Sequence, residues 1–462
     1  MKHFYFLCFT LLFFLGISNS HAQQKSSVYF KNGDVICFLG DSITHGGQYH
    51  EFLQLFYATR YPELKLSFHN CGISGDNAAG MVERFEEDVM KHNPTHVFLM
   101  TGMNDVIRTL YFEGIANDKI LNQRNTALEN YKKQTKLLLE KIKAQQVVPV
   151  LLTPSIYDQY SKIEKENNLG CNDALIECSN HIKKLGNKYD ALVIDLNTPM
   201  KELMERELKK DSLFTIVGKD RVHPGSTGHF IMFEEIISAL EPETMVSKIT
   251  IELYNDEHSI KNENVALRNV QLSDSLISFQ THENSLPFPL GNYLDKALSL
   301  TSFMDVNNQQ LLQVEGLKNG AYDLFIENVF IDRFSTQELS SGVNLATKEN
   351  TPHYKQAQEI KRLCSAYRQT QFQLRAVAFI RHSYLNDYKG PEDIKLMQRH
   401  LTKKLKIIEG KPYYNYIKKN MEAYFETLPK IDSLKNRLDT IQNIIYFNNT
   451  PQQLGWRLVK QD

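Results

Sequence analysis

Five short apolar runs, separated by longer stretches with helical periodicity, constrain the fold of this chain most strongly. Each run is apolar on successive residues and rich in branched side chains, which is typical of parallel strands buried on both faces. The runs are VICFLG (35–40), LSFHNCG (66–72), HVFLMTG (96–102), VVPVLLT (147–153) and ALVIDLN (191–197). This alternation predicts an α/β domain with a parallel sheet over 23–245, and such a sheet carries its working loops at the carboxyl ends of the strands.

The pattern changes after about residue 245. Segments such as SKITIELY (247–254) alternate apolar and polar residues, and Asn319-Gly320 is a strong hairpin signal, so a small antiparallel β module is predicted over 246–350. A helical region is predicted over 351–462, where apolar stripes of the kind that form a helical core return at helical spacing. The three stripes are Ile360, Leu363, Tyr367, Leu374 and Val377, then Met397, Leu401, Leu405 and Ile408, then Ile431, Leu434, Leu438, Ile441 and Ile445.

The first residues have the organisation of a secretory signal peptide. A basic start at Lys2 precedes an apolar stretch from Phe4 to Ile17, and the small residues Ser20 and Ala22 follow at the spacing of a cleavage site. The alternative is a membrane anchor, which needs about 20 apolar residues and therefore more than this stretch supplies. Residues 1–22 are predicted to be a signal peptide, and the protein is predicted to be secreted or periplasmic.

Composition argues against several classes of partner. The formal net charge is -1 and 42% of the residues are hydrophobic, so nothing favours nucleic acid or stable membrane insertion. An odd number of cysteines follows the signal peptide, so at least one thiol is free, and a disulfide between Cys171 and Cys178 stays open. No cysteine and histidine spacing matches a zinc site. We expect no metal and no cofactor, and the sequence does not specify an oligomeric state.

A serine follows the first predicted strand directly, in the sequence Gly40-Asp41-Ser42-Ile43-Thr44. At a strand-to-helix junction its hydroxyl is exposed, and its backbone N–H lies near a helix N-terminus, where partial positive charge suits a developing oxyanion. The alternative is helix capping, which Asp and Ser perform routinely. On this segment alone capping is the commoner explanation, so the other strand ends decide between the two.

Two further strand ends supply hydrogen-bond donors. The second strand ends at Gly72, which lets a backbone N–H approach a ligand, and the third is followed by Asn104 with its side-chain amide. Each signal alone is weak, since glycine and asparagine are common in turns. Together with the N–H of Ser42, they provide three donors at adjacent strand ends, which is what an oxyanion hole requires.

The last loop of the domain, KDRVHPGSTGH (219–229), supplies a base. His223 is predicted to accept the proton of Ser42, and Asp220 is predicted to fix the tautomer of the imidazole. The alternative is that His223 caps the next helix while Asp220 lies on the surface. The order Ser, Gly, Asn and then Asp-x-x-His, each after a strand of one domain, favours the catalytic interpretation.

These segments together resemble the conserved blocks of the SGNH hydrolases, also called the GDSL family of esterases and lipases. The resemblance covers about residues 33–242, with Ser42 in GDSIT as nucleophile, Gly72 in block two, Asn104 in GMND, and Asp220 and His223 in DRVHP. It implies a flavodoxin-like three-layer sandwich with a five-stranded parallel sheet, and ester hydrolysis through an acyl-serine without a metal. Family precedent points to carbohydrate O-acetyl esters as substrates. The later segment AYDLFIENVFIDRFSTQELSSGVNLA (321–346) looks like an extension found after some secreted bacterial members.

Two other functions stay open at this point. The large β and helical additions would also fit a carbohydrate-binding or scaffolding protein with a vestigial hydrolase domain. An acyl-serine could also be captured by a sugar alcohol, which would make the protein an acyltransferase. Among the neighbouring residues, Asp41 and Thr44 are expected to brace the turn, Asp105 to cap the helix after the third strand, and His45 and His50 to be surface histidines.

Overall fold

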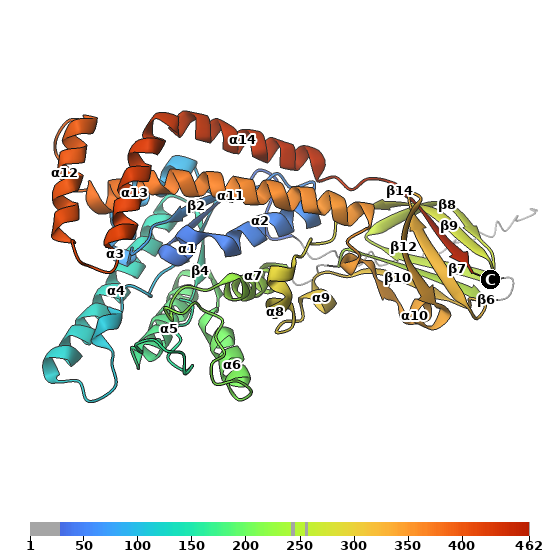
Figure 1. The fold of residues 1–462 in the computed structure, drawn as a ribbon, viewed down its shortest axis with the longest axis horizontal. Coiled ribbons are helices and arrows are strands. Elements are labelled where there is room, and N and C mark those ends of the chain that lie inside the picture. Colours follow the sequence, from blue (N-terminus) through green and yellow to red (C-terminus); the bar gives the residue numbers. More distant parts are fainter. Residues whose placement is uncertain (1–27, 242–244, 255–256, 462) are drawn as a thin grey trace, which may run out of the picture.

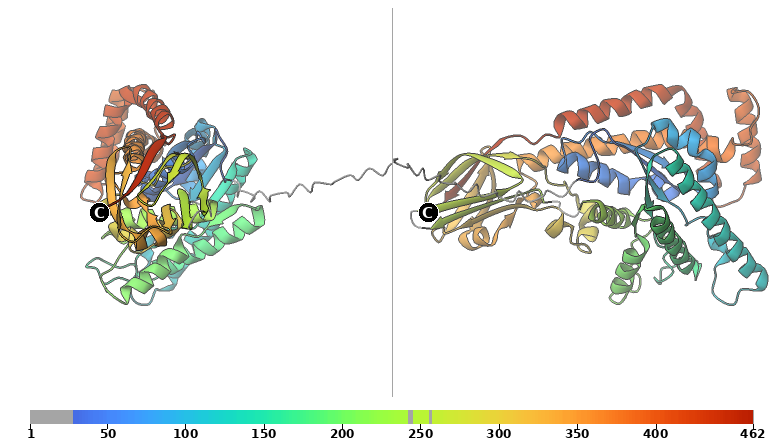
Figure 2. Two further views of the ribbon diagram at one scale, coloured as in Figure 1. Left: turned by 90° about the vertical axis from the view of Figure 1, so that its right-hand side faces the viewer. Right: turned by 180° about the vertical axis from the view of Figure 1, so that it is seen from behind.

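The computed structural model describes residues 28–241, 245–254 and 257–461. The predicted signal peptide lies outside these residues and stays a prediction. Among the helices of the described part, none has the length and apolar character needed to cross a bilayer. The molecule is elongated: a parallel-sheet domain and a β module lie at opposite ends, and the long helix α11 (Pro352–Tyr384) runs from one to the other (Figures 1 and 2).

The first domain is built on a sheet of five parallel strands in the order β2-β1-β3-β4-β5. The strands are β1 (Val35–Gly40), β2 (Ser67–Gly72), β3 (His96–Met100), β4 (Val148–Leu152) and β5 (Leu192–Ile194). All five lie within the predicted apolar runs, so the predicted fold class is confirmed. The strand order reverses at β1, and in sheets of this type the crevice at such a reversal is where ligands bind.

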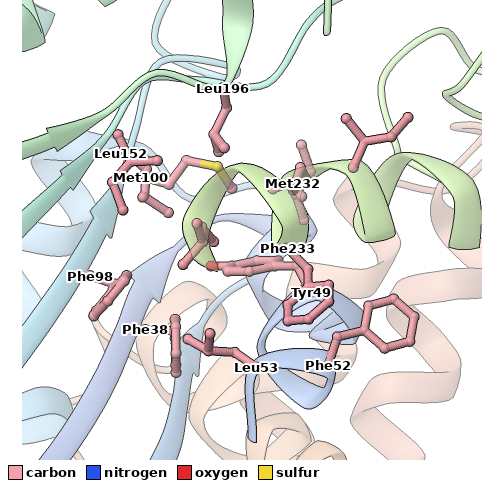
Figure 3. Close-up of a cluster of buried hydrophobic side chains, with 14 of the residues drawn as sticks. Phe38, Tyr49, Phe52, Leu53, Phe98, Met100, Leu152, Leu196, Met232 and Phe233 are labelled. Carbon is pink, nitrogen blue, oxygen red and sulfur yellow. The ribbon is translucent and has the colours of Figure 1, made fainter. Parts of the chain in front are cut away.

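Helices cover both faces of this sheet and make three layers. One face packs against helices that include α2 (Gln48–Arg60), α6 (Asn197–Leu208) and α7 (Ser226–Leu240), and the other packs against α3 (Ala78–Arg84), α4 (Asp118–Ala144) and α5 (Cys171–Tyr189). Aromatic side chains fill the first interface, where Phe38 of β1 lies 5.1 Å from Phe98 and 5.7 Å from Tyr49 between ring centroids (Figure 3). The shorter turns of this domain are α1 (Ser42–Gly46), η1 (Phe85–Val89), η2 (Met90–His92) and η3 (Arg108–Leu110).

The β module consists of two sheets whose inner faces share one apolar core. One sheet has the order β13-β10-β6-β7 and the other β12-β11-β14-β9-β8. The strands are β6 (Ser247–Tyr254), β7 (Glu257–Glu263), β8 (Val265–Leu272), β9 (Leu276–Glu283), β10 (Gln310–Glu315), β11 (Ala321–Ile326), β12 (Val329–Ser335), β13 (Val343–Asn344) and β14 (Leu454–Lys460). The second sheet is antiparallel as predicted, whereas β6 and β10 pair in parallel because a long connection separates them.

The last part of that connection, residues 284–309 between β9 and β10, packs back onto the first domain. Phe288 stacks on Phe233 of α7 with 5.5 Å between ring centroids, and Phe303 lies 5.0 Å from Phe230. The module is therefore fixed to the sheet domain through a shared aromatic core. Short helical turns in and after this segment are η4 (Asn292–Leu294), α8 (Asp295–Leu298), α9 (Phe303–Val306), α10 (Thr336–Ser341) and η5 (Leu345–Thr347).

The prediction of a hairpin at Asn319-Gly320 is wrong. The strands on either side of it, β10 and β11, belong to different sheets, so the chain crosses from one sheet to the other at this point. The tight hairpin lies one strand later, between β11 and β12, where Glu327 and Asn328 have φ values of 47° and 62°. Positive φ at both central residues is the backbone of a type I′ turn, which matches the twist of paired strands.

The helical region folds back along the sheet domain and contains the three predicted apolar stripes. After α11 come α12 (Ile394–Ile407), α13 (Tyr414–Thr427), η6 (Leu428–Lys430) and α14 (Ile431–Asn448). Helices α11 and α14 lie beside β2, which is the edge strand of the parallel sheet. The Gln371 amide donates to the carbonyl of Phe68 at 2.6 Å, and Tyr446 accepts from the N–H of Leu66 at 2.7 Å. These contacts pair an edge that would otherwise be open.

The helical region predicted over 351–462 contains helices as far as Asn448, but its last segment is a strand. Residues 454–460 form β14, which lies between β9 and β11 in the middle of the five-stranded sheet. Its inward side chains Leu454, Trp456 and Leu458 are each at most 3% exposed. The β module thus depends on a strand that follows the entire helical region in sequence.

Glu283 makes the stability of this module depend on pH. Burial raises the pKa of Glu283 to about 7, although hydrogen bonds with Ser247 and Gln310 act in the opposite direction. The folded protein therefore binds this proton more tightly than the unfolded chain, whose glutamates titrate near 4.3. The contribution of this proton to the stability of the folded protein is complete below about pH 4, and it is lost as the pH rises to about 7.

We expect the stability of the Glu283→Gln variant to increase relative to that of wild type as the pH rises. The free energy of unfolding of the variant minus that of wild type should increase by about 3 kcal/mol between pH 4 and pH 8. Trp456 is the single tryptophan and lies in the core of the module, so its fluorescence reports this transition. The exposed Glu263→Gln serves as control, and an equal response of both variants to pH would contradict the prediction.

Candidate active site

The turn after β1 holds Ser42 at the first position of α1. The Asp41 side chain accepts a hydrogen bond from the N–H of Ile43 at 2.9 Å, and the Thr44 hydroxyl lies 3.1 Å from that of Tyr49, so both residues brace the turn as expected. Burial raises the pKa of Asp41 to about 6, against the opposing effect of the Ile43 N–H. Ser42 itself is half-buried, and its hydroxyl is directed toward the loop that follows α6.

Ser42, His223 and Asp220 form one continuous hydrogen-bonded chain. The hydroxyl oxygen of Ser42 lies 2.8 Å from Nε2 of His223, and Nδ1 of His223 lies 2.5 Å from Oδ2 of Asp220. The N–H groups of Val222 and His223 donate to the other carboxylate oxygen at 3.1 and 3.0 Å. In this arrangement Nδ1 carries the proton shared with the carboxylate, so Nε2 is free to accept the serine proton.

The carboxylate of Asp220 stays ionised in this setting. Partial burial alone would raise its pKa, but hydrogen bonds from the His223 ring and from the N–H groups of His223 and Val222 hold the pKa well below its usual range. An ionised carboxylate next to Nδ1 stabilises the imidazolium that forms when His223 accepts a proton. The side chains of His223 and Asp220 are each 48% exposed, so water reaches the site directly.

Arg221 lies between Asp220 and His223 in the sequence and anchors their loop. Its φ of 67° lies in the left-handed region that a branched or long side chain rarely adopts, and its side chain is buried. The guanidinium donates to the carbonyls of Asp158 and Ile163, each at 2.9 Å, and the N–H of Asp158 donates back to the carbonyl of Arg221. These bonds fix the backbone of the loop and thereby the positions of Asp220 and His223.

Asn104 lies on the opposite side of the site with its amide oriented by an arginine. Arg108 donates to Oδ1 of Asn104 at 2.9 Å, so the amide nitrogen must be on the other side, where it donates to the carbonyl of Asp76 at 2.8 Å. A side-chain amide has two N–H groups, and this contact uses one of them. The second is available to a ligand.

Gly72 is not free for the predicted role. Its N–H already donates to Oδ1 of Asn70 at 2.8 Å, and a Cβ at this position would lie 2.2 Å from the backbone nitrogen of His45. The glycine is therefore required for close packing of β2 against α1. Three residues later, Gly75 lies exposed in the turn with φ of 80°, and within the described residues neither its N–H nor that of Ser42 has a hydrogen-bond acceptor.

Three neighbouring residues differ from expectation. Asp105 does not cap the helix after β3: its carboxylate accepts from the N–H groups of Gly102 and of Ala78, the first residue of α3, each at 3.0 Å, and so joins the segments after β2 and β3. His45 and His50 are buried rather than on the surface, and burial lowers the pKa of both imidazoles to about 3. Both rings are therefore neutral, so neither adds charge near Ser42.

The cysteines also resolve the question that the sequence left open. Cys37, Cys71, Cys171, Cys178 and Cys364 are all free and buried. Cys171 and Cys178 therefore form no disulfide, and they act as small apolar groups in the core of the sheet domain. In the part of the chain that the structure describes, no group of three or more His, Cys, Asp or Glu residues could hold a metal ion.

Comparison with known proteins agrees with this fold. Residues 38–231, which span β1 to the middle of α7, match the model of the GDSL-like Lipase/Acylhydrolase family. The parallel-sheet domain is therefore a GDSL-like hydrolase domain. As a GDSL hydrolase, the protein acts on ester bonds.

Two relatives of this GDSL hydrolase differ in how much of the chain they share. An acetylxylan esterase from Geobacillus stearothermophilus is 25% identical over 217 residues, which cover 44% of this chain and 91% of the esterase. A solved structure described as BT4096, a gut microbial diltiazem-metabolizing enzyme, has 25% identity and a TM-score of 0.84, and it covers 95% of this chain and 100% of its own. The β module and helical region of the GDSL hydrolase therefore also occur in a solved enzyme.

Sequence reasoning missed several residues around the site of this GDSL hydrolase. Arg108 has no motif that marks it, and Arg221 lies inside DRVHP but received no role. Gly75 had a visible signal, because ISGDN places a second glycine after β2. The choice between the two glycines depends on which N–H is already bonded, and only the folded backbone shows that.

Proposed function

We propose that the protein is a serine esterase with Ser42 as nucleophile, His223 as general base and Asp220 as the group that orients the base. The observation that carries this proposal is the hydrogen-bonded chain from the Ser42 hydroxyl through His223 to Asp220. A serine hydroxyl is a weak nucleophile unless a base removes its proton during attack. Nε2 of His223 lies within hydrogen-bond distance of that proton.

In the acylation half-reaction, Oγ of Ser42 forms a bond to the ester carbonyl carbon while its proton moves to Nε2 of His223. The carbonyl oxygen becomes an oxyanion, for which we assign the N–H of Ser42, the free N–H of Asn104 and the N–H of Gly75 in place of that of Gly72. Each donor of this kind typically contributes about 3 to 4 kcal/mol of transition-state stabilisation. The bond to the alcohol oxygen then breaks, and that oxygen takes the proton from Nε2.

Deacylation repeats these steps with water. The water gives a proton to Nε2 of His223 and attacks the acyl-serine, and the second tetrahedral adduct expels Oγ of Ser42, which recovers the proton. The acid is released and the site returns to its starting state. The half-exposed side chains of His223 and Asp220 favour water over a sugar alcohol as acceptor, because transfer requires a site from which water is excluded.

For the substrate, we propose an O-acetyl ester of a carbohydrate. The support is the acetylxylan esterase, of whose length the match covers 91%. The enzyme that shares the whole architecture is described as diltiazem-metabolizing, so non-carbohydrate esters belong in the substrate panel. A scaffold with a vestigial domain is the weaker candidate, because the Ser42, His223 and Asp220 geometry is intact.

The proposal is tested by measuring acid release from acetylated xylooligosaccharides, with the butyryl and octanoyl esters of p-nitrophenol beside p-nitrophenyl acetate. We expect the acetyl esters to be hydrolysed fastest. A fluorophosphonate should label the protein at one residue, Ser42, and labelling should stop turnover. Full turnover after complete labelling would exclude the serine mechanism, and an acetylated sugar formed from an added acceptor would establish acyl transfer instead.

A further inference from the structure

An arginine from the helical region enters the sheet domain beside the proposed active site. Arg375, in the middle of α11, is buried, and its Nε donates to the carbonyl of Gly72 at 3.0 Å. Gly72 is the last residue of the edge strand β2, and the turn that contains Gly75 follows it. The helix thus holds the backbone at the point where the chain leaves the sheet and enters the site.

The same guanidinium forms a buried ion pair with Asp88. Its two terminal nitrogens donate to the two carboxylate oxygens, each at 2.7 Å, and this forked geometry is specific to arginine. Asp88 has no exposed side-chain surface. Burial alone would raise the pKa of Asp88, but Arg375 and Arg84 hold it well below its usual range, so the carboxylate is charged.

Arg84 continues this network into both turns of the site. It donates to Asp88 at 2.6 Å, to the carboxylate of Asp76 at 2.7 Å and to the carbonyl of Gly40 at 3.2 Å. Gly40 immediately precedes Asp41 and Ser42, and the carbonyl of Asp76 accepts the Asn104 amide at 2.8 Å. Arg375 is therefore connected, through Asp88, Arg84 and Asp76, to the turns of all three proposed oxyanion donors.

A second contact from the helical region reaches the same turn. The hydroxyl of Tyr416 on α13 donates to the hydroxyl of Ser74 at 2.9 Å, next to Gly75. The Ser74 hydroxyl also lies 3.0 Å from Nδ1 of His45, which is one helical turn after Ser42. Two separate helices of the extension thus brace the turn that carries the third donor.

We propose that Arg375 is a positioning residue for the oxyanion side of the active site, so the helical region is part of the catalytic apparatus. This inference rests on the proposed esterase function. Arg375 does not contact the Ser42, His223 and Asp220 chain, and its bonds lead only to the turns with Gly40, Gly72 and Asp76. Loss of Arg375 should therefore weaken oxyanion stabilisation and leave proton transfer by His223 unchanged.

The test compares Arg375→Gln with Arg381→Gln in the full chain. Arg381 lies on the same helix, but its ion pair with Glu392 is exposed and has a distance of 3.6 Å. For p-nitrophenyl acetate we expect R375Q to lower kcat by about tenfold to a hundredfold, as misplaced catalytic groups do, with KM nearly unchanged. The affinity for phenylboronic acid, whose tetrahedral adduct with Ser42 places an oxygen in the oxyanion site, should fall in parallel. The midpoint of the pH–kcat profile should stay at its wild-type value.

Arg375→Lys separates positioning from stability, because removal of one partner of a buried ion pair is strongly destabilising. Lysine keeps the charge opposite Asp88 but lacks the fork that also reaches the Gly72 carbonyl. We expect its Tm to lie closer to wild type than that of R375Q, while kcat and boronate affinity stay low. Wild-type kcat and boronate affinity in folded R375K or R375Q would overturn the inference. A wild-type protein without esterase activity would instead refute the proposed function.

Discussion

The Ser42→Ala variant is expected to lose about a millionfold in kcat for p-nitrophenyl acetate, which is the scale seen when the nucleophile of a serine hydrolase is removed. The Ser42 side chain has one hydrogen-bond partner among the described residues, Nε2 of His223, so its removal leaves the turn intact. Asp41 still caps the N–H of Ile43. The Tm and the circular dichroism spectrum should therefore match those of wild type.

A matched control for this loss is Ser226→Ala. Ser226 is also the first residue of a helix and lies three residues after His223, but among the described residues its side chain has no hydrogen bond to the proposed triad. The control should keep wild-type turnover and should still be labelled by the fluorophosphonate, whereas S42A should not be labelled. Substantial turnover by a folded S42A protein would remove Ser42 from its proposed role.

The second large effect is expected for Asp220→Asn, which should lower kcat by ~10⁴-fold, the scale known for this substitution in other triads. The N–H groups of Val222 and His223 both donate to Oδ1, so the amide oxygen of the asparagine must occupy that position. The NH2 group is then directed at Nδ1 of His223. That nitrogen becomes an acceptor, and the proton moves to Nε2, where it blocks uptake of the Ser42 proton.

Asp211→Asn provides the control for D220N in the same connection between α6 and α7. Asp211 is exposed and accepts from the N–H of Leu213 at 2.9 Å, a contact that an asparagine oxygen can also make. Its kcat should equal that of wild type. If D220N retained more than a tenth of wild-type kcat while D211N behaved normally, the tautomer argument and the role of Asp220 would both fail.

The sheet domain could be predicted from the sequence because its strands are buried on both faces. Each strand is then a continuous apolar run, which is a local signal, and β1 has the predicted bounds 35–40. The placement of Ser42 and Asn104 at one edge was likewise predictable, because strand ends of a parallel sheet meet there. Asp220 and His223 lie instead in the connection between α6 and α7, where their spacing, and not a strand end, indicated the role. The distances that join Ser42, His223 and Asp220 are consistent with the catalytic interpretation.

The features that escaped prediction depend on contacts between distant segments. β14 alternates buried residues with half-buried or exposed ones over only seven positions, and its partners β9 and β11 lie before the whole helical region. Arg375 belongs to a helix whose local pattern indicates only a core-facing stripe, yet its partner Asp88 lies 287 residues earlier. The residues next to β14 and Arg375 in the sequence do not indicate either of these pairings.

The central place of β14 in its sheet has a consequence for biosynthesis. On the ribosome, β9 and β11 emerge long before the strand that must lie between them, because residues 352–448 are translated first. Until then the nascent module exposes two unpaired strand edges, which readily pair with other chains. The parallel-sheet domain has all its strands by residue 194 and can begin folding earlier. Closure of the second sheet is thus the late step in maturation, during which a molecular chaperone would be of most use.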